Sequence, residues 1–291
     1  TLSAHVRAAG YKVVLTGEGA DEIFAGYDLF REARVRRFVA RNPLSRIRPH
    51  LFRRLYHYLP SIQSQSAEYL AAFFAAGADR LDDPLFAYRP RVRATAQTKL
   101  FYSEDLRARL NGYDATAALA ERLPARFNAW HPLHQAQYLE TTVLLPGYIL
   151  ASQGDRVSMA NSVEGRFPFL DHRLVEFAAR IPTEMKLRGL DEKHILKHAA
   201  RGLVPDSIAQ RSKQPYRAPD AESFRAATYV DDALATPTGL FNPSAVQKLA
   251  LKARSGTMSG FRDNAAFVGI LSTQLWHRAF AGKSSFLTDA A

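Results

Sequence analysis

The sequence contains no cysteine among its 291 residues. Without thiol side chains, this chain cannot form disulfides, bind zinc through cysteine or use a thiol as its nucleophile. The absence leaves the cellular compartment open, because both cytoplasmic and secreted proteins can lack cysteine. The compartment must therefore be argued from other features of the sequence.

Long apolar segments are also missing. No apolar run approaches the roughly 20 residues that a membrane-spanning helix needs. The opening segment, Thr1–Tyr11, lacks the apolar core of a signal peptide. We therefore expect no membrane partner, and the cytoplasm is the default location. Hydrophobic residues still make up 47% of the chain, which suffices for a globular core.

Acidic residues are scarce relative to basic ones, and the formal net charge is +11. Residues 31–54 hold nine arginines and a single acid, Glu32. Two interpretations stay open: attraction of a polyanion such as RNA, or a solvated helical face. Aromatic residues at helical spacing in the same stretch favour packing, so nucleic acid is disfavoured as a partner. A positive field would also attract ATP, pyrophosphate and an acidic amino acid.

A glycine-rich turn near the start carries the strongest local signal. The apolar run Val13–Leu15 closes on Thr16–Gly19, and three acids, Glu18, Asp21 and Glu22, fall within five positions. Glycines allow close approach of a ligand, and backbone N–H groups at such a turn suit phosphate. Acids beside phosphate usually hold magnesium. The pattern predicts a nucleotide–metal site at the carboxyl end of a parallel strand, with an ordinary strand–turn–helix connection as the alternative.

This turn and three later segments resemble the signatures of the asparagine synthetase family, which are glutamine-dependent amidotransferases. The four blocks occur in the family order and the resemblance covers about residues 5 to 285. They are Leu15–Glu22 with Gly26–Tyr27, Asp155–Ala160 with Glu164–Asp171, Glu192–Lys197, and Arg211–Pro215. The resemblance implies an α/β fold: the later, mostly helical part of a doubly wound parallel-sheet ATP-pyrophosphatase (adenine nucleotide α-hydrolase-like) domain. It also implies ATP and Mg²⁺ as cofactors.

Two family features are not found in this sequence. Family members begin with a glutaminase domain whose N-terminal cysteine is the nucleophile, and they carry a Ser-Gly-Gly-x-Asp-Ser phosphate loop before the Gly-Glu-Gly block. We therefore expect residues 1–291 to form a truncated synthetase domain that is inactive alone. Its expected partner is the N-terminal glutaminase domain of the same polypeptide. Exposed strand edges also make a homodimer a candidate.

The resemblance implies a two-step reaction. A carboxylate of aspartate attacks the α-phosphate of ATP, giving an acyl-adenylate and pyrophosphate, and ammonia then gives asparagine and AMP. Relatives act on other acceptors, including natural products, sugars and peptides, so the acceptor stays open. Relatives that form β-lactams lack the acid that is Glu18 here, which favours attack by ammonia. A non-catalytic nucleotide- or RNA-binding module is the alternative from another class.

Three residues are assigned central roles by this resemblance. Asp21 is the expected magnesium ligand, although an acid at a helix N-terminus also complements the helix dipole. Glu18 would act on the nitrogen nucleophile or the tetrahedral intermediate. Lys193 would be the catalytic cation on the α-phosphate, whereas lysines in general lie on the surface.

The remaining candidates share roles in binding. Those expected to contact the adenylate or the pyrophosphate are Thr16, Gly17, Arg211 and Lys213, and those expected to bind the acceptor are Glu22, for its amino group, with Asp155, Arg156, Glu164 and Arg166. For the last four, structural ion pairs are an equally open interpretation. His194 and His198 have a metal-ligand spacing without a third ligand nearby, so a zinc site is disfavoured.

Periodicity predicts one strand, Lys12–Leu15, followed by mostly helical structure. One helix is expected from Asp21 to about Val39. Another is expected over Leu133–Leu145, ended by Pro146.

Overall fold

The computed structural model describes residues 2–75, 77–211, 213, 220–235, 238–258 and 260–281. The chain divides into two compact units, Thr1–Arg89 with Arg122–Gln214, and Pro90–Glu121 with Pro215–Ala291. The assignment of residues 1–291 to one truncated synthetase domain stays a prediction. Within the described ranges, no helix is both long and apolar enough to cross a membrane.

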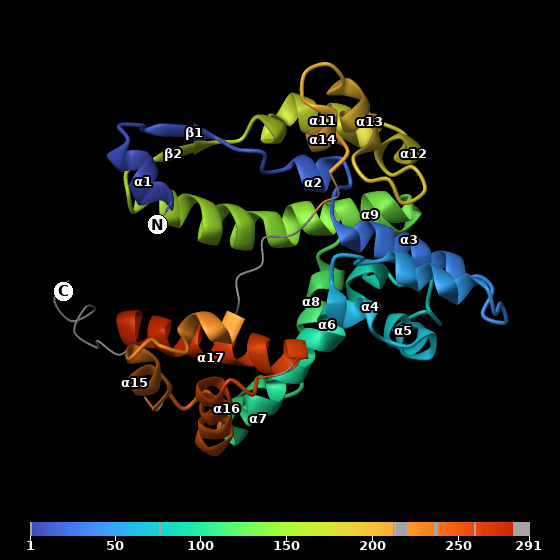
Figure 1. The fold of residues 1–291 in the computed structure, drawn as a ribbon. Helices are drawn as coiled ribbons and strands as arrows, with labels where there is room; N and C mark the ends of the chain where they lie inside the picture. The colour runs from blue at the N-terminus through green and yellow to red at the C-terminus, as the bar shows by residue number, and fades with distance from the viewer. Residues whose placement is uncertain are drawn as a thin grey trace. The chain divides into compact units, whose positions relative to one another are not determined.

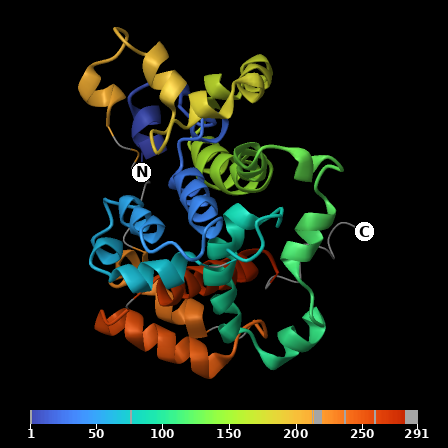
Figure 2. The same cartoon turned by 90° about the vertical axis from the view of Figure 1, so that its right-hand side faces the viewer.

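The first unit is mostly helical and holds a small sheet (Figures 1 and 2). Its elements are α1 (Leu2–Ala8), β1 (Val13–Leu15), α2 (Ala20–Ile23), α3 (Asp28–Ala40), η1 (Arg48–Arg54), α4 (Pro60–Gln63), α5 (Ala67–Phe74), η2 (Phe86–Tyr88), η4 (Phe127–Ala129), α9 (Pro132–Leu139), η5 (Glu140–Asp155), α10 (Arg156–Met159), β2 (Glu164–Arg166), η6 (Pro168–Leu170), α11 (His172–Arg180), α12 (Thr183–Lys186), α13 (His194–Ala199) and α14 (Asp206–Ala209).

The sheet pairs two strands that are far apart in the sequence. β1 lies parallel to β2, with Val13 opposite Glu164 and Leu15 opposite Arg166 (Figure 1). The expected strand at Lys12–Leu15 is confirmed, but the expectation of a single strand is wrong. The sequence did not reveal β2 because Glu-Gly-Arg has neither alternation nor β-branched residues. The predicted doubly wound sheet is thus represented, among the described residues, by one parallel pair.

This parallel pair is open to solvent. Leu15 is 74% exposed, and Glu164 and Arg166 are exposed as well. Parallel strands are normally buried on both faces, and an isolated strand pair is only marginally stable. The helices around the sheet therefore contribute most of the apolar burial in this unit.

The single helix expected from Asp21 to Val39 is instead divided into α2 and α3. The break occurs at Ala25, whose φ of 59° lies in the left-handed region. The Gly26 N–H donates to the Asp21 carbonyl at 2.8 Å and closes the turn. The helical period continued across this break, so the sequence did not reveal it.

A second expectation, that Pro146 ends a helix at Leu145, is also wrong. The chain continues from α9 through η5, a π-helical segment that contains Pro146, to α10. Proline is excluded from α-helices by a clash with the carbonyl four residues earlier. The wider i→i+5 turns of η5 carry the chain past it. Figure 1 shows the segment that begins at α9 continuing as one long green helix, and α2 contacts both α9 and η5.

The arginine-rich stretch is only partly turned into this unit: Arg31 and Arg36 are buried, whereas five of its nine arginines are exposed. Arg36 is 1% exposed and donates to the carbonyls of Phe74 and Phe86 at 3.0 and 2.9 Å. Other arginines of the stretch also donate to main-chain carbonyls: Arg34 to Leu187, Arg37 to Leu81 and Arg48 to Phe38. The bonds from Arg34, Arg36 and Arg37 satisfy buried or partly buried carbonyls, so the solvated face expected from the charge describes only part of the stretch.

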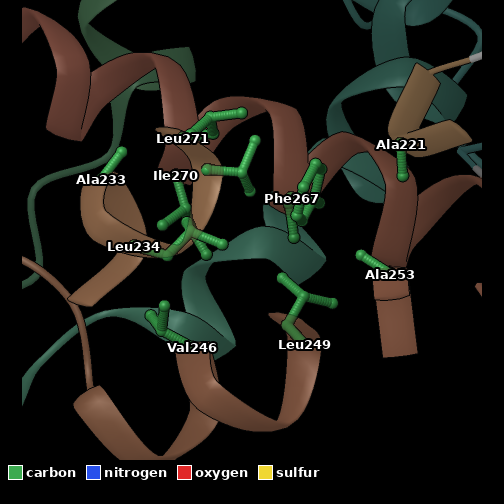
Figure 3. Close-up of a cluster of buried hydrophobic side chains, with 11 residues drawn as sticks. Ala221, Ala233, Leu234, Val246, Leu249, Ala253, Phe267, Ile270 and Leu271 are labelled. Carbon is green, nitrogen blue, oxygen red and sulfur yellow. The ribbon is translucent and has the colours of Figure 1, made fainter. Parts of the chain in front are cut away.

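The second unit has its own apolar core (Figure 3). Its elements are η3 (Gln97–Phe101), α7 (Glu104–Leu110), α8 (Ala115–Glu121), η7 (Asp220–Phe224), α15 (Tyr229–Ala235), α16 (Pro243–Ser255) and α17 (Gly260–Phe280), with α6 (Arg89–Ala96) at its boundary. Leu249, Phe267, Ile270 and Leu271 converge between α16 and α17. This cluster is formed wholly by aliphatic and aromatic side chains.

We predict that Phe267→Ala destabilises the second unit by about 3–5 kcal/mol, because a fully buried ring leaves a cavity. The exposed Leu251 on α16 provides the control, and Leu251→Ala should stay within about 0.5 kcal/mol of the parent. Hydrogen exchange of α15–α17 during urea unfolding measures both. Equal effects of the two substitutions would contradict this assignment of the core.

Candidate functional site

The turn after β1 places the acidic segment at the carboxyl end of the strand. The Thr16 N–H donates to the Arg166 carbonyl at 3.0 Å, which extends the strand pairing into the turn. The Ala20 N–H then donates to the Gly17 carbonyl at 3.2 Å. Gly19 has a φ of 92°, and a Cβ there would overlap Leu170. The chain therefore reverses into α2 only with glycine at this position.

The centre of the candidate site is the Asp21 carboxylate, which accepts from two lysines. Lys193 Nζ lies 2.9 Å from Oδ1, and Lys213 Nζ lies 2.7 Å from Oδ2. All three side chains are largely but not fully buried. The structure thus brings together three of the predicted residues, from three of the resembling blocks. Two ammonium groups on one carboxylate leave a net positive charge that suits phosphate.

Lys193 reaches this position from a strained backbone. Its φ of 50° is left-handed, and it forms the N-cap of α13 without a capping side chain. Such conformations cost of order 1–3 kcal/mol in non-glycine residues and cluster at functional sites. The lysine extends past Gly26, whose missing Cβ leaves the space that the Asp21 carboxylate occupies.

Glu22 is turned away from the two lysines. Glu22 is 1% exposed, and its carboxylate accepts from the Tyr27 hydroxyl at 2.8 Å. Burial is the main cause that raises the pKa of Glu22, although the Tyr27 bond opposes it. The Tyr27 ring in turn lies 5.6 Å below Lys213 Nζ. Glu22 therefore supports the aromatic platform under Lys213, and its predicted contact with an amino group of the acceptor stays a prediction.

A buried lysine that the sequence analysis missed supports the same turn. Lys186 is 1% exposed and donates to Gln137 Oε1 at 3.2 Å. Gln137 Nε2 donates to the Glu22 carbonyl at 2.6 Å. Burial lowers the pKa of Lys186 to about 8. No sequence signal marks this lysine, because its burial depends on the packing of α9 and α12.

Other predicted residues lie apart from this cluster or make no contact with it. The Glu18 side chain has no hydrogen bond or ion pair to any described residue, and the Thr16 hydroxyl is buried without a partner in the same part of the chain. Glu164 and Arg166 form an exposed ion pair with each other at 2.8 Å. Those that are solvent-exposed without a contact to Asp21 are Asp155, Arg156 and Arg211. Their binding roles stay predictions.

The protein groups near Asp21 can bind a magnesium ion only if phosphate oxygens supply further ligands. No group of three or more histidine and acidic side chains that could hold a metal ion occurs in the described part of the chain. His194 is used otherwise, since its Nδ1 lies 2.6 Å from Asp191 and its ring packs against His198. A single carboxylate completed by phosphate oxygens and water is a common arrangement for Mg²⁺. Asp21 therefore fits as one ligand of such an ion.

Comparison with known proteins gives a consistent result. The family model described as asparagine synthase matches residues 1–278. Among curated proteins, Amidase chyE of Penicillium rubens is 33% identical and Amidase chry2 of Gibberella zeae is 30% identical, each over 75% of this chain. Asparagine synthetase [glutamine-hydrolyzing] 1 of Bacillus subtilis is 28% identical over 71% of the chain.

The chain spans only part of these relatives. The matches cover 34% of each amidase and 30% of the Bacillus subtilis synthetase. No solved structure matches this chain.

We predict that Gly26→Ala weakens the packing of α2 against Lys193. The added Cβ would overlap Asp21 Oδ1 and lie 3.0 Å from Lys193 Cδ, so the ion pair must shift. Overpacking of this kind costs about 1–3 kcal/mol. Hydrogen exchange of α2 and α13 should accelerate accordingly. Gly147→Ala is the control, because no atom lies within 4 Å of its added Cβ, and unchanged exchange in Gly26→Ala would refute the steric argument.

We also predict that the free energy of unfolding depends on pH through the titration of Lys186. Burial lowers its pKa to about 8 in the folded protein from 10.5 for a solvated lysine, so between these values the unfolded chain binds the extra proton. Stability therefore rises with pH across this window, by up to about 3 kcal/mol at about 1.4 kcal/mol per pKa unit. In Lys186→Met the rise should be absent. Urea unfolding at pH 7 to 11 compares the two proteins, and parallel curves would contradict the prediction.

Proposed function

Because the chain belongs to the asparagine synthase family, we propose that it carries the ATP-dependent amidation site of a larger enzyme. The observation that carries the proposal is the Asp21 carboxylate between Lys193 and Lys213 at the end of β1. Ligands of open α/β sheets bind at this edge. The carboxylate there can bind a metal ion, and the two ammonium groups can bind the phosphates of a nucleoside triphosphate.

The two lysines would bind the phosphates of ATP. Their present pairing with Asp21 is partly exposed and therefore exchangeable with stronger anionic partners. Lys193 would neutralise charge on the α-phosphate and Lys213 on the departing pyrophosphate. Asp21 would hold a magnesium ion, which supplies charge neutralisation of the pyrophosphate when bound.

The chemistry would proceed in two balanced steps. An oxygen of the acceptor carboxylate forms a bond to the α-phosphorus, and the bond to the bridging oxygen breaks, releasing pyrophosphate. Ammonia then attacks the acyl carbon, AMP leaves, and the nitrogen loses a proton. Glu18 would take that proton, and its side chain, which has no other partner among the described residues, is available for this role.

The acceptor is proposed to be a carboxylate other than free aspartate. Two relatives that match over 75% of this chain, at 33% and 30% identity, are named amidases, while Asparagine synthetase [glutamine-hydrolyzing] 1 of Bacillus subtilis is 28% identical over 71% of the chain. In addition, Glu22, the residue expected to hold the amino group of aspartate, is buried against Tyr27. Both observations favour an acceptor that lacks this amino-group contact.

Ammonia would come from glutamine through another domain of the same polypeptide. The chain contains no cysteine, so it cannot itself supply the thiol nucleophile of the family's glutaminase. The RNA-binding alternative is weakened at Arg36 and Arg37, whose guanidinium groups donate to carbonyls inside the first unit, although other arginines of the stretch are exposed.

Carboxylate-dependent exchange of radioactive pyrophosphate into ATP tests this proposal in the natural protein. We expect exchange with Mg²⁺ and an acceptor carboxylate, and a loss of at least about 100-fold in Lys193→Ala. Lys248→Ala, an exposed lysine on α16, is the matched control and should retain exchange.

The same assay discriminates the acceptor. Exchange that is fastest with aspartate would overturn the proposed acceptor while leaving adenylation intact. Normal exchange by the Lys193→Ala protein would show that Lys193 has no role in adenylation.

A further inference from the structure

Glu192, which directly precedes Lys193 and opens the third resembling block, is a buried acid to which the resemblance assigns no role. It is 4% exposed, and its carboxylate meets three donors. These are Arg31 Nη1 at 3.5 Å, Lys197 Nζ at 3.4 Å and the main-chain N–H of Lys213 at 3.4 Å. A buried carboxylate is costly unless it is paired in this way.

Two of the three donors do not depend on Glu192. Arg31 also pairs with Asp28, and Lys197 also pairs with Asp191 at 2.7 Å. For the Lys213 N–H, Glu192 is the acceptor that the structure provides. The distinctive contact of Glu192 is therefore the one with the main chain of Lys213.

This contact links the two lysines of the site. Lys193 follows Glu192 in the chain, and Lys213 is held at its main chain by Glu192 and at its ammonium group by Asp21. A lysine side chain alone has many rotamers, and a fixed main chain reduces the positions that its ammonium group can reach. Glu192 therefore connects the main-chain positions from which the two lysine side chains extend.

We propose that Glu192 is a positioning residue for pyrophosphate, acting through the main chain of Lys213. This inference rests on the proposed function, in which Lys213 binds phosphate. We do not expect Glu192 itself to touch the ligand, because it is only 4% exposed. Its removal should therefore change binding only while Lys213 is present.

Calorimetric titration of the natural protein with inorganic pyrophosphate and Mg²⁺ tests the proposal. Glu192→Met keeps the volume but removes the acceptor, and we expect about 5- to 20-fold weaker binding. Glu192→Gln keeps an acceptor oxygen and should stay within about 3-fold of the parent. Asp191→Asn is the matched control: it shares Lys197 but has no contact with Lys213, so it should bind like the parent.

A double-mutant cycle separates positioning from general destabilisation. Adding Glu192→Met to Lys213→Met should weaken binding no further, since Glu192 acts through Lys213. Parent-like binding by Glu192→Met, or additive losses in the double variant, would overturn the proposal. If Glu192→Met does not fold by circular dichroism, Glu192→Asp replaces it, because it keeps the charge but withdraws the acceptor by one methylene.

The outcomes also distinguish this inference from the proposed function. Weak binding by Lys213→Met with parent-like binding by Glu192→Met overturns only the role of Glu192. Parent-like binding by Lys213→Met overturns the phosphate role of Lys213, and the inference fails with it.

Discussion

The sharing of one carboxylate by two ammonium groups is the interaction on which the site depends. Asp21 can accept from Lys193 and Lys213 only because the chain turns sharply on both sides of α2 and leaves no Cβ at Gly26. The left-handed backbone at Lys193 directs that side chain into the same space. Several costly local conformations are thus compensated by a single electrostatic cluster.

The residue types in the turn after β1 allowed part of this arrangement to be predicted from the sequence. Glycines and acids after an apolar run indicated a site at Asp21, and the resemblance added Lys193 and Lys213 from distant blocks. Predictions from the sequence fail where packing between distant segments determines the local structure. β2 forms from Glu-Gly-Arg only by pairing with β1, and Lys186 is buried by α9 and α12. Neither effect leaves a local pattern, because both depend on segments remote in the chain.

The arginine-rich stretch shows a second limit of reasoning from composition. Nine arginines in residues 31–54 suggested a charged surface, yet Arg36 is buried and donates to two carbonyls. An arginine can satisfy several main-chain acceptors at once and stack on a ring, as Arg36 does on Phe86. Net charge therefore describes the attraction of the molecule for anions but does not locate the side chains that produce it.

The order in which the chain assembles follows from how far apart the partners of Asp21 lie. Its two ion pairs join residues separated by 172 and 192 positions, and β1 pairs with a strand some 150 positions later. Contacts of such high sequence separation form late, since long loops must close before they stabilise anything. The charge cluster is consequently a marker of completed folding: a growing polypeptide would acquire its phosphate-binding charge only after Lys213 has been synthesised and the first unit has closed.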